Sequence, residues 1–284
     1  MGYYIIYPIF YLLSLLPFCI LYFFSDILFV LLFYVFKYRR RVVQDNLSKS
    51  FPNYSKTELN RIEKDFFKFL CDLIVETLKL LTISEKQIKA RCRYSEKIMK
   101  TFQTAYSDGN NIMILMGHFG NWEWAGASYN LHFPNANYAL YHPLSNKSFN
   151  KLMIKIRTRF GTKLLPMKTA YRDILMNKNN ASVFSFIADQ CPSLQNSFWM
   201  NFLNQDTAVY YGPEKINNRL NCLVVFISLK KEKRGYYSAD VHEVTNNQAD
   251  TYPIMSNFMV LLEKEIIRQP HIWLWSHKRW KYKK

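Results

Sequence analysis

The chain has 284 residues, which is enough for one substantial domain or for a domain with an appendage. Thirty-eight lysines and arginines against 21 acidic residues give a formal net charge of +17, which favours an anionic partner such as nucleic acid, a membrane surface or an acidic protein. The five cysteines form no C-x-x-C pair, so neither a zinc knuckle nor a redox dithiol is indicated, and reduced thiols in a cytoplasm-facing protein are expected.

The chain begins with a long apolar segment. Residues 3–25 carry no charge, and 23 helical residues would span roughly 34 Å, enough to cross a hydrocarbon core of about 30 Å. Pro8 and Pro17 are expected to kink this helix without preventing insertion. A basic start and a small-residue cleavage site are both missing, which argues against a secretory signal. We therefore predict an N-terminal membrane helix rather than a buried core hairpin.

Asp26 interrupts the apolar segment, and a second run continues over 27–36 before Lys37 and Arg39 to Arg41. This run is too short to cross, so it could return to the surface or lie in the interface, with its basic end among anionic headgroups. The positive-inside tendency favours the cytoplasmic side for the basic cluster. We divide the chain into an anchor with a basic flank (1–41) and a second domain (42–284).

A capping box, Ser55-Lys56-Thr57-Glu58, opens a long helical pattern. Apolar residues then recur at helical spacing up to Leu81, which predicts an amphipathic helix of about seven turns. Glu76 falls on or near the apolar face of this helix. We interpret it as a partly exposed residue at the edge of the apolar stripe, with a functional buried acid as the alternative.

From residue 112 onward, short apolar runs alternate with amphipathic stretches. The runs that suit strands are 112–116, 136–141, 162–166, 182–188, 222–229 and 236–244. The stretches that suit helices are 121–131, 147–160, 168–178, 212–220 and 253–268. This alternation predicts an α/β fold with a mixed, largely parallel sheet flanked by helices.

The sequence MGHFGNWEWAG follows the first predicted strand. It places His118 just past a strand's carboxyl end, where open α/β sheets bind ligands. Gly117 and Gly120 permit a tight turn, and Asn121 suits the N-cap of the next helix. Glu123 would lie in the first helical turn and point back towards the imidazole, as a carboxylate that orients a general base. A packed structural histidine explains the same pattern, and spacing alone leaves both interpretations open.

Other candidate site residues are weaker. Asp189 ends a predicted strand and could be either a site residue or a turn residue. Arg157 and Arg159 lie on a basic helix that could be a solvated face or a phosphate site. A G-x-S-x-G elbow, a P-loop and a G-x-G-x-x-G fingerprint are missing from the sequence. The terminal IWLWSHKRWKYKK would suit a membrane interface or a polyanion, and we assign no catalytic role to His277.

With these residues in place, the chain resembles the bacterial lipid A biosynthesis (lauroyl/myristoyl) acyltransferases, within the wider lysophospholipid acyltransferase superfamily. The likeness covers nearly the whole length. It includes the basic stretch YVFKYRRRVVQDNLSKSFP, the H-x-x-x-x-[DE] block HFGNWE (His118 to Glu123), an R-x-x-x-G stretch from Arg157, the Asp189-Gln190 pair, the segment FLNQDTAVYYGPEKINNRLNCLVVF with Gly212 and Ile216, and the closing WLWSHKRWK. Leu203-Asn204 and Asn217 depart from the family pattern, and we expect these positions to shape the acyl or acceptor pocket.

The resemblance implies transfer of a fatty acyl group from acyl carrier protein thioester to a hydroxyl of a lipid A precursor, at an anionic bacterial inner membrane and on its cytoplasmic face. It implies no metal and no cofactor. In this family pattern His118 is the general base and Glu123 supports it, Arg157 binds phosphate or stabilises charge, and Asp189 orders the site. Gly120, Asn121, Arg159, Gln190 and Gly212 take substrate-binding positions.

Three alternatives remain. The acceptor could be a lysophospholipid, an aminolipid or another glycolipid. The protein could instead be a non-catalytic membrane tether for an acidic partner, in which case HFGNWE is only turn chemistry. Nucleic-acid binding has support only from charge and aromatic content, and the uncharged N-terminus argues against it, so we expect no nucleic-acid partner.

Overall fold

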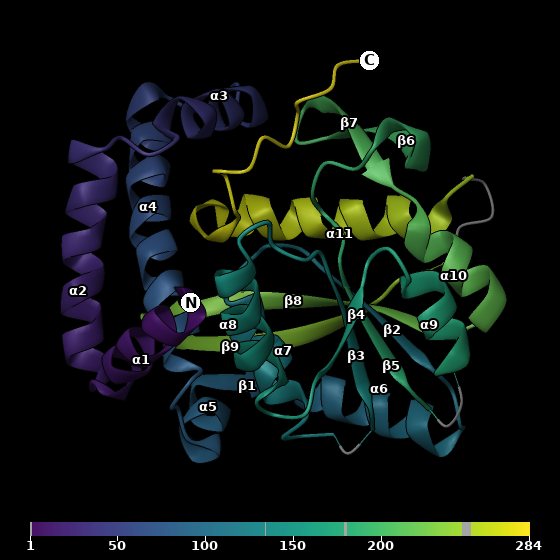
Figure 1. Ribbon diagram of the computed structural model, residues 1–284. Helices are drawn as coiled ribbons and strands as arrows, with labels where there is room; N and C mark the ends of the chain where they lie inside the picture. Colours follow the sequence, from purple (N-terminus) through teal and green to yellow (C-terminus); the bar gives the residue numbers. More distant parts are fainter. Residues whose placement is uncertain (1, 134, 179–180, 246–250) are drawn as a thin grey trace.

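A seven-stranded sheet forms the centre of the molecule in the computed structural model, which describes residues 2–133, 135–178, 181–245 and 251–284 (Figure 1). Its strand order is β1-β9-β8-β2-β5-β3-β4, and neighbouring strands are parallel except for the antiparallel pair β8–β9. The strands are β1 (Cys92–Tyr94), β2 (Ile112–Met116), β3 (Asn137–Tyr141), β4 (Lys163–Pro166), β5 (Val183–Ile187), β8 (Leu223–Lys233) and β9 (Tyr236–Glu243).

This architecture confirms the predicted α/β fold and its mixed, largely parallel sheet. Strand β2 is buried along its whole length because it lies between β8 and β5 with both faces covered, which explains its uninterrupted apolar sequence. All six predicted strands are present. Strand β1 was not predicted, since three residues are too short to show a periodic pattern.

Helices cover both faces of the sheet (Figure 1). On one face, Phe258 of helix α11 (Pro253–Arg268) packs against Phe226 of β8. The next residue, Ile227, points to the opposite face, since side chains alternate along a strand. The other helices around the sheet are α5 (Glu85–Arg91), α6 (Glu96–Ser107), α7 (Trp122–Tyr129), α8 (Lys147–Thr158), α9 (Ala170–Met176) and α10 (Gly212–Leu220), with 3₁₀ turns η2 (Leu194–Asn196) and η3 (Pro270–Ile272).

A two-stranded hairpin, β6 (Ser197–Phe202) and β7 (Gln205–Tyr210), stands apart from the main sheet and was not predicted. Its turn is Leu203-Asn204, and both residues have left-handed backbone angles (φ 51° and 60°), as a tight hairpin turn requires. The Asn204 amide donates to the backbone oxygen of Ser50. These two residues therefore form a hairpin tip, and the expectation that they shape a substrate pocket stays a prediction.

Helix α4 (Lys56–Lys79) is the long amphipathic helix that the sequence predicted. Ser55 and Glu58 form both hydrogen bonds of the capping box, which confirms its start. The interpretation of Glu76 as a partly exposed residue is wrong: it is only 1% exposed. The apolar stripe of α4 is wider than expected because the helix is covered on two sides, by the sheet and by the N-terminal helices.

The N-terminal apolar segment folds as two helices rather than one. Helix α1 (Gly2–Leu15) ends before Pro17, and α2 (Phe18–Val30) continues as a π-helical turn, η1 (Leu31–Val35). Asp26 interrupts the apolar run but not the helix: it lies within α2 at an exposed position, and its carboxylate binds the Arg234 guanidinium at 2.7 Å. Within the described part of the chain, the helix that is long and apolar enough to cross a membrane, by length and composition, is Phe18–Val35 instead of residues 3–25.

Helix α2 runs alongside α4 (Figure 1). Its inner residues Phe29 and Phe33 belong to the same hydrophobic core as the rest of the protein, and Phe33 packs edge-on against Phe67 of α4 with ring centroids 5.4 Å apart. After α2, helix α3 (Arg40–Ser50) leads into α4. The core is thus continuous across residue 41. The outer side of α2 is apolar and exposed, with Phe23 at 62%.

A buried lysine holds the elbow between α1 and α2. The Lys79 ammonium, near the end of α4, donates to the backbone oxygens of Ser14 (2.8 Å) and Leu16 (2.9 Å). Thr82 donates to the same Ser14 oxygen. These carbonyls lie at the C-terminal end of α1, where unpaired acceptors and the negative end of the helix dipole favour a cation.

We predict that Lys79→Met destabilises the protein by about 1–3 kcal/mol, because it leaves the Ser14 and Leu16 carbonyls without a buried donor. Thermal or urea unfolding in detergent measures this change. Lys64→Met, at an exposed position on the same helix, is the control and should change stability by less than about 0.5 kcal/mol. Equal stability of the two variants would contradict a role of Lys79 in the elbow.

Candidate functional site

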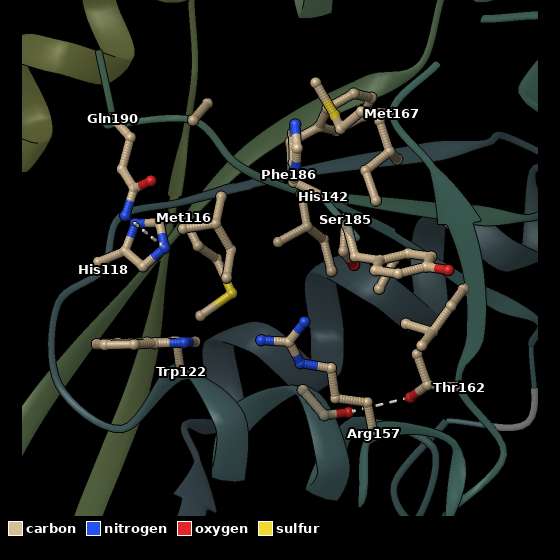
Figure 2. Close-up of a pocket in the computed structure, with 18 of the residues that line it drawn as sticks. Met116, His118, Trp122, His142, Arg157, Thr162, Met167, Ser185, Phe186 and Gln190 are labelled. Carbon is tan, nitrogen blue, oxygen red and sulfur yellow. Dashed lines mark hydrogen bonds between the residues drawn. The ribbon is translucent and has the colours of Figure 1, made fainter. Parts of the chain in front are cut away.

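A cavity of about 910 Å³ lies on the face of the sheet opposite α11. Polar groups on its wall include His118, Arg157 and Gln190, which Figure 2 shows, and also Glu123. Much of the remaining wall is apolar and comes from the strands and from helices α6 and α7, including Phe102, Ile114, Met116, Ala127, Tyr129, Ala139, Leu140, Leu164 and Ile227. A cavity of this size, mostly apolar with a few convergent polar groups, is suited to an elongated apolar ligand with a reactive polar end.

His118 lies in the turn between β2 and α7, which the surrounding chain holds tightly. Gly120 has φ +65°, and a Cβ there would lie 2.7 Å from the Leu229 side chain, so the turn requires glycine. The Gly120 amide donates to the Ile272 carbonyl, and the His118 carbonyl accepts from the Leu274 amide. The turn that carries the imidazole is thus fixed to the C-terminal segment.

Asp189 orients the imidazole. One of its oxygens contacts His118 Nδ1 at 2.6 Å, and the other accepts from the His118 backbone amide and the Trp273 indole, both at 2.8 Å. A carboxylate can only accept, so Nδ1 carries a proton, and in the neutral imidazole Nε2 is then the nitrogen with the lone pair. This is the protonation that a general base at Nε2 needs.

The Asp189 carboxyl stays ionised although it is only 2% exposed. Burial alone would raise its pKa, but the charge that His118 carries when protonated and the hydrogen bonds from His118 and Trp273 hold the pKa below its usual value. The Arg279 guanidinium adds positive charge nearby; burial lowers its pKa to about 10, and the charge of Asp189 opposes that shift. Asp189 is therefore a fixed negative charge behind the imidazole.

The free side of the imidazole faces the cavity. The Gln190 amide nitrogen lies 3.2 Å from His118 Nε2, and the Trp122 ring packs edge-on against the imidazole with centroids 5.0 Å apart (Figure 2). A substrate hydroxyl that approaches Nε2 would take the place of the Gln190 amide.

Glu123 does not contact His118. It lies in the first turn of α7, as predicted, but binds Arg157 of α8, with Nε 3.0 Å and Nη2 2.5 Å from its two oxygens. Burial alone would lower the pKa of Arg157, but the charge and hydrogen bonds of Glu123 raise it. The carboxylate that orients the imidazole is therefore Asp189, and the expected contact of Glu123 with the ring is corrected to an ion pair with Arg157.

The other predicted site residues fall into two groups. Gln190 lines the cavity, whereas Gly120 and Asn121 build the turn beneath it. Arg159 and Gly212 lie outside the cavity lining. The Arg159 guanidinium donates to the Leu80 carbonyl at 2.6 Å, and Gly212 begins α10, where the Tyr210 ring leaves no room for a Cβ.

Sequence reasoning missed the contribution of the C-terminal segment. Trp273 and Trp275 are buried beneath the site, at 3% and 0% exposure, so the expectation that this segment suits a membrane interface or a polyanion is wrong for these two rings. Arg279 is 2% exposed and donates to the Ala208 carbonyl. The indole of Trp273 binds the Asp189 carboxylate, and in the sequence only the closing motif WLWSHKRWK pointed to this segment.

Metal ligation has no support in the described part of the chain, where no group of three or more histidine, cysteine, aspartate or glutamate side chains could hold a metal ion. The arrangement instead offers a base, its orienting carboxylate and a buried ion pair around one cavity. These groups suit proton transfer coupled to nucleophilic attack.

Residues 1–282 match the family model described as bacterial lipid A biosynthesis acyltransferase. A curated relative, the lipid A biosynthesis palmitoleoyltransferase of Escherichia coli (strain K12), is 23% identical over 248 residues, which cover 86% of this chain and 79% of the relative. The lipid A biosynthesis acyltransferase of Shigella flexneri matches with the same identity and coverage.

We predict that the stability contributed by Asp189 depends on pH. Because the pKa of Asp189 is lower in the folded than in the unfolded chain, this contribution is complete above the unfolded value of about 3.9 and is lost as the pH falls through the folded value. The difference in unfolding free energy between wild type and Asp189→Asn should be about 1–3 kcal/mol at pH 5.5 and shrink towards pH 3.

Denaturant unfolding at each pH measures this difference. Asp45→Asn, at an exposed position, is the control and should show a small difference at every pH. A wild-type advantage over Asp189→Asn that is as large at pH 3 as at pH 5.5 would mean that the ionised carboxylate is not what stabilises the site.

Proposed function

The chain belongs to the family of bacterial lipid A biosynthesis acyltransferases, and from this membership we propose that it transfers a fatty acyl chain from acyl carrier protein thioester to a hydroxyl of a lipid A precursor, with His118 as general base. The observation that carries the proposal is the bond between Asp189 and His118 Nδ1, which leaves Nε2 open to the cavity.

The reaction follows from this protonation. Nε2 accepts the proton of the acceptor hydroxyl as its oxygen attacks the thioester carbonyl carbon. The tetrahedral intermediate then expels the thiolate, which takes the proton back from Nε2, so the products are an ester and a thiol. Asp189 supports the imidazolium that forms in between, and such acid–base assistance is typically worth about 10²–10⁴-fold in rate.

The Glu123–Arg157 pair has a separate role. Nε and Nη2 of Arg157 bind Glu123, while the guanidinium faces the cavity (Figure 2). A buried guanidinium held by a carboxylate is a preorganised donor for an anionic oxygen, either on the acceptor or in the tetrahedral intermediate. Glu123 thus keeps Arg157 in place and limits the cost of its burial.

The donor and acceptor fit the charge and the cavity. Acyl carrier protein is strongly acidic and the acceptor carries phosphates, so a chain of net charge +17 attracts both. The apolar wall formed by Met116, Ala127 and Leu140 suits the hydrocarbon chain, whose thioester then lies next to His118.

We further propose that the protein binds the cytoplasmic leaflet of the bacterial inner membrane through α2, which lies along the surface rather than crossing the bilayer. The adjacent helix α4 exposes Arg61, Lys64 and Lys68, and the Lys68 ammonium lies over the Phe29 ring of α2. If α2 crossed the bilayer, these charges would enter hydrocarbon, at several kcal/mol each. The exposed Phe23 and its apolar neighbours can instead enter the interface.

Activity of purified protein tests the reaction. With acyl carrier protein thioester and a tetra-acylated lipid A precursor, wild type should form the acylated lipid, and His118→Ala should lower the rate at least 10²-fold because no base remains. Glu123→Gln and Arg157→Lys should each lower it at least tenfold. His132→Ala is the control, since His132 lies outside the cavity lining, and it should keep the wild-type rate.

Equal rates for wild type and His118→Ala would refute the role of His118. Wild type could instead be inactive with this acceptor but acylate a lysophospholipid, an aminolipid or another glycolipid. That result would replace the proposed acceptor and leave the proposed reaction unchanged.

Flotation with vesicles of phosphatidylethanolamine and phosphatidylglycerol tests the membrane contact. The double substitution Phe23→Ser/Ile27→Ser should weaken binding at least tenfold, because it removes about 2 kcal/mol of apolar burial. Ile267→Ser, on the outer side of α11, is the matched control, as Ile267 is 50% exposed. Equal losses for both variants would argue against α2 as the membrane-binding surface.

A further inference from the structure

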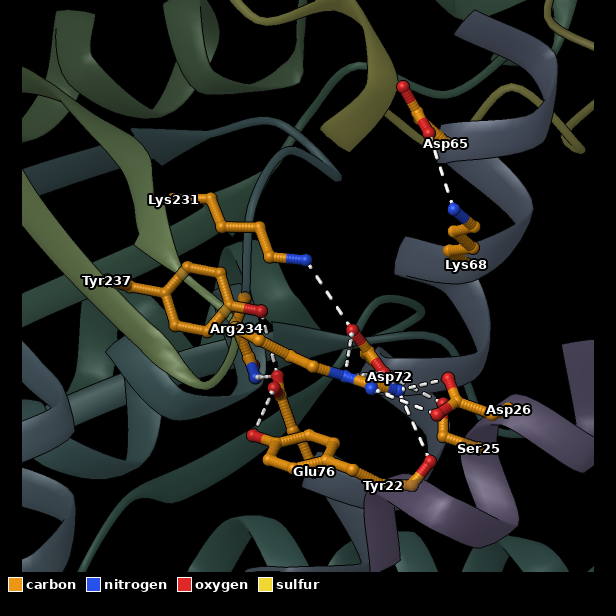
Figure 3. Close-up of polar contacts among 11 residues, drawn as sticks. Tyr22, Ser25, Asp26, Asp65, Lys68, Asp72, Glu76, Lys231, Arg234 and Tyr237 are labelled. Atoms are coloured by element: carbon orange, nitrogen blue, oxygen red, sulfur yellow. Dashed lines mark hydrogen bonds and ion pairs between the residues drawn. The ribbon is translucent and has the colours of Figure 1, made fainter. Parts of the chain in front are cut away.

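A buried glutamate that takes no part in the proposed reaction lies beneath the catalytic turn. The Glu76 carboxylate accepts three hydrogen bonds, from the Tyr22 hydroxyl (2.9 Å), the Asn121 amide (2.7 Å) and the Tyr237 hydroxyl (2.8 Å). Figure 3 shows it between the two tyrosine side chains. All three donors are neutral, so among the described residues no cation is bonded to this carboxylate.

The acid one turn earlier on α4 is compensated differently. Asp72 binds the Arg234 guanidinium at 2.6 Å and the Lys231 ammonium at 3.5 Å (Figure 3). Burial, and then the charge of Asp72, raises the pKa of Glu76 to about 7. An acid buried without a bonded cation costs stability, and here only the three hydrogen bonds from Tyr22, Asn121 and Tyr237 offset that cost. The reason for a glutamate must therefore lie in the groups that it holds.

Asn121 is the group that connects Glu76 to the site. Its amide nitrogen donates to Glu76, and its amide oxygen accepts from the Trp124 backbone amide at 2.9 Å, as the N-cap of α7. A carboxyl oxygen that accepts a hydrogen bond can bind only the nitrogen end of the amide, so Glu76 determines which end faces the helix. The backbone oxygen of Glu76 also accepts from the Trp124 indole at 2.8 Å.

The first turn of α7 carries two side chains that surround the reacting groups. Trp122 packs on the His118 ring, and Glu123 holds Arg157. A displacement of about 1 Å in such a site can cost about 10²-fold in rate. We propose that Glu76 is a positioning residue for acyl transfer, which holds the Asn121 cap and so sets Trp122 and Glu123 relative to His118. The proposal rests on the function argued above.

Two leucine substitutions on the same helix test it. Glu76→Leu removes the acceptor beneath the turn. Glu63→Leu is the matched control, because Glu63 is equally buried (2% exposed) but lies 13 residues earlier, about 20 Å along α4, and binds Arg40. Both variants should melt at lower temperature. Only Glu76→Leu should lower kcat at least tenfold, with KM for the acyl donor within threefold, while Glu63→Leu keeps kcat within twofold.

Hydrogen exchange of the backbone amides over residues 117–126 gives a readout that needs no substrate. Exchange there should rise at least tenfold in Glu76→Leu and stay near the wild-type rate in Glu63→Leu, since only the first variant frees the Asn121 cap. If wild type is inactive but exchange still rises only in Glu76→Leu, the acyl-transfer function is refuted. The conclusion that Glu76 holds the turn through Asn121 then still stands. Unchanged exchange and kcat in Glu76→Leu, or equal changes in both variants, would overturn the proposal.

If Glu76→Leu does not fold, a pair of substitutions that swaps the acid and the amide between positions 76 and 121 tests the same hydrogen bond. Asn121→Asp keeps the cap acceptor but sets two carboxylates face to face, so kcat should fall at least tenfold. Adding Glu76→Gln restores the hydrogen bond with donor and acceptor reversed, and the double variant should recover most of the loss. Failure to recover would show that this bond does not position the site.

Discussion

The Asp189 carboxylate is the point on which the arrangement of the site depends. It accepts hydrogen bonds from the backbone and ring of His118 and from the indole of Trp273, and so joins three segments that are far apart in the chain. A charge at 2% exposure is tolerable only when such donors surround it. The same hydrogen bonds therefore stabilise the buried Asp189 carboxylate and place the proton of the imidazole on Nδ1. The C-terminal segment is needed because Trp273 supplies one of these bonds.

Two pairs at the cavity each join a carboxylate to a nitrogen-bearing side chain: Asp189 with His118, and Glu123 with Arg157. Asp189 acts on the imidazole from behind, whereas Glu123 acts on Arg157 from the side. Asp189 follows β5 and His118 follows β2, whereas Glu123 lies in α7 and Arg157 in α8. Neither pair can therefore form until these strands and helices have packed together. This dependence ties proposed catalytic competence to folding of the whole domain rather than to one local motif.

Strand ends were predictable from the sequence, and contacts between them were not. Apolar runs ending at His118 and Asp189 located both residues at the same edge of a parallel sheet, but only the strand order, with β5 next to β2, makes them neighbours. Spacing put Glu123 in the first turn of α7 without fixing its direction, and Arg157, 34 residues later, binds it. The exposure of Glu76 was predicted wrongly because helical periodicity identifies a single apolar face, whereas α4 is covered on two sides.

The packing of α2 against α4 bears on how the protein can be produced. Phe29 and Phe33 fill the common core, and Tyr22 supplies one of the three donors to Glu76. A shortened chain that begins after residue 36 would uncover Phe67 and leave a buried carboxylate short of a partner. The N-terminal helices are thus a structural part of the enzyme, and a soluble form is better sought by making the outer side of α2 polar than by truncation.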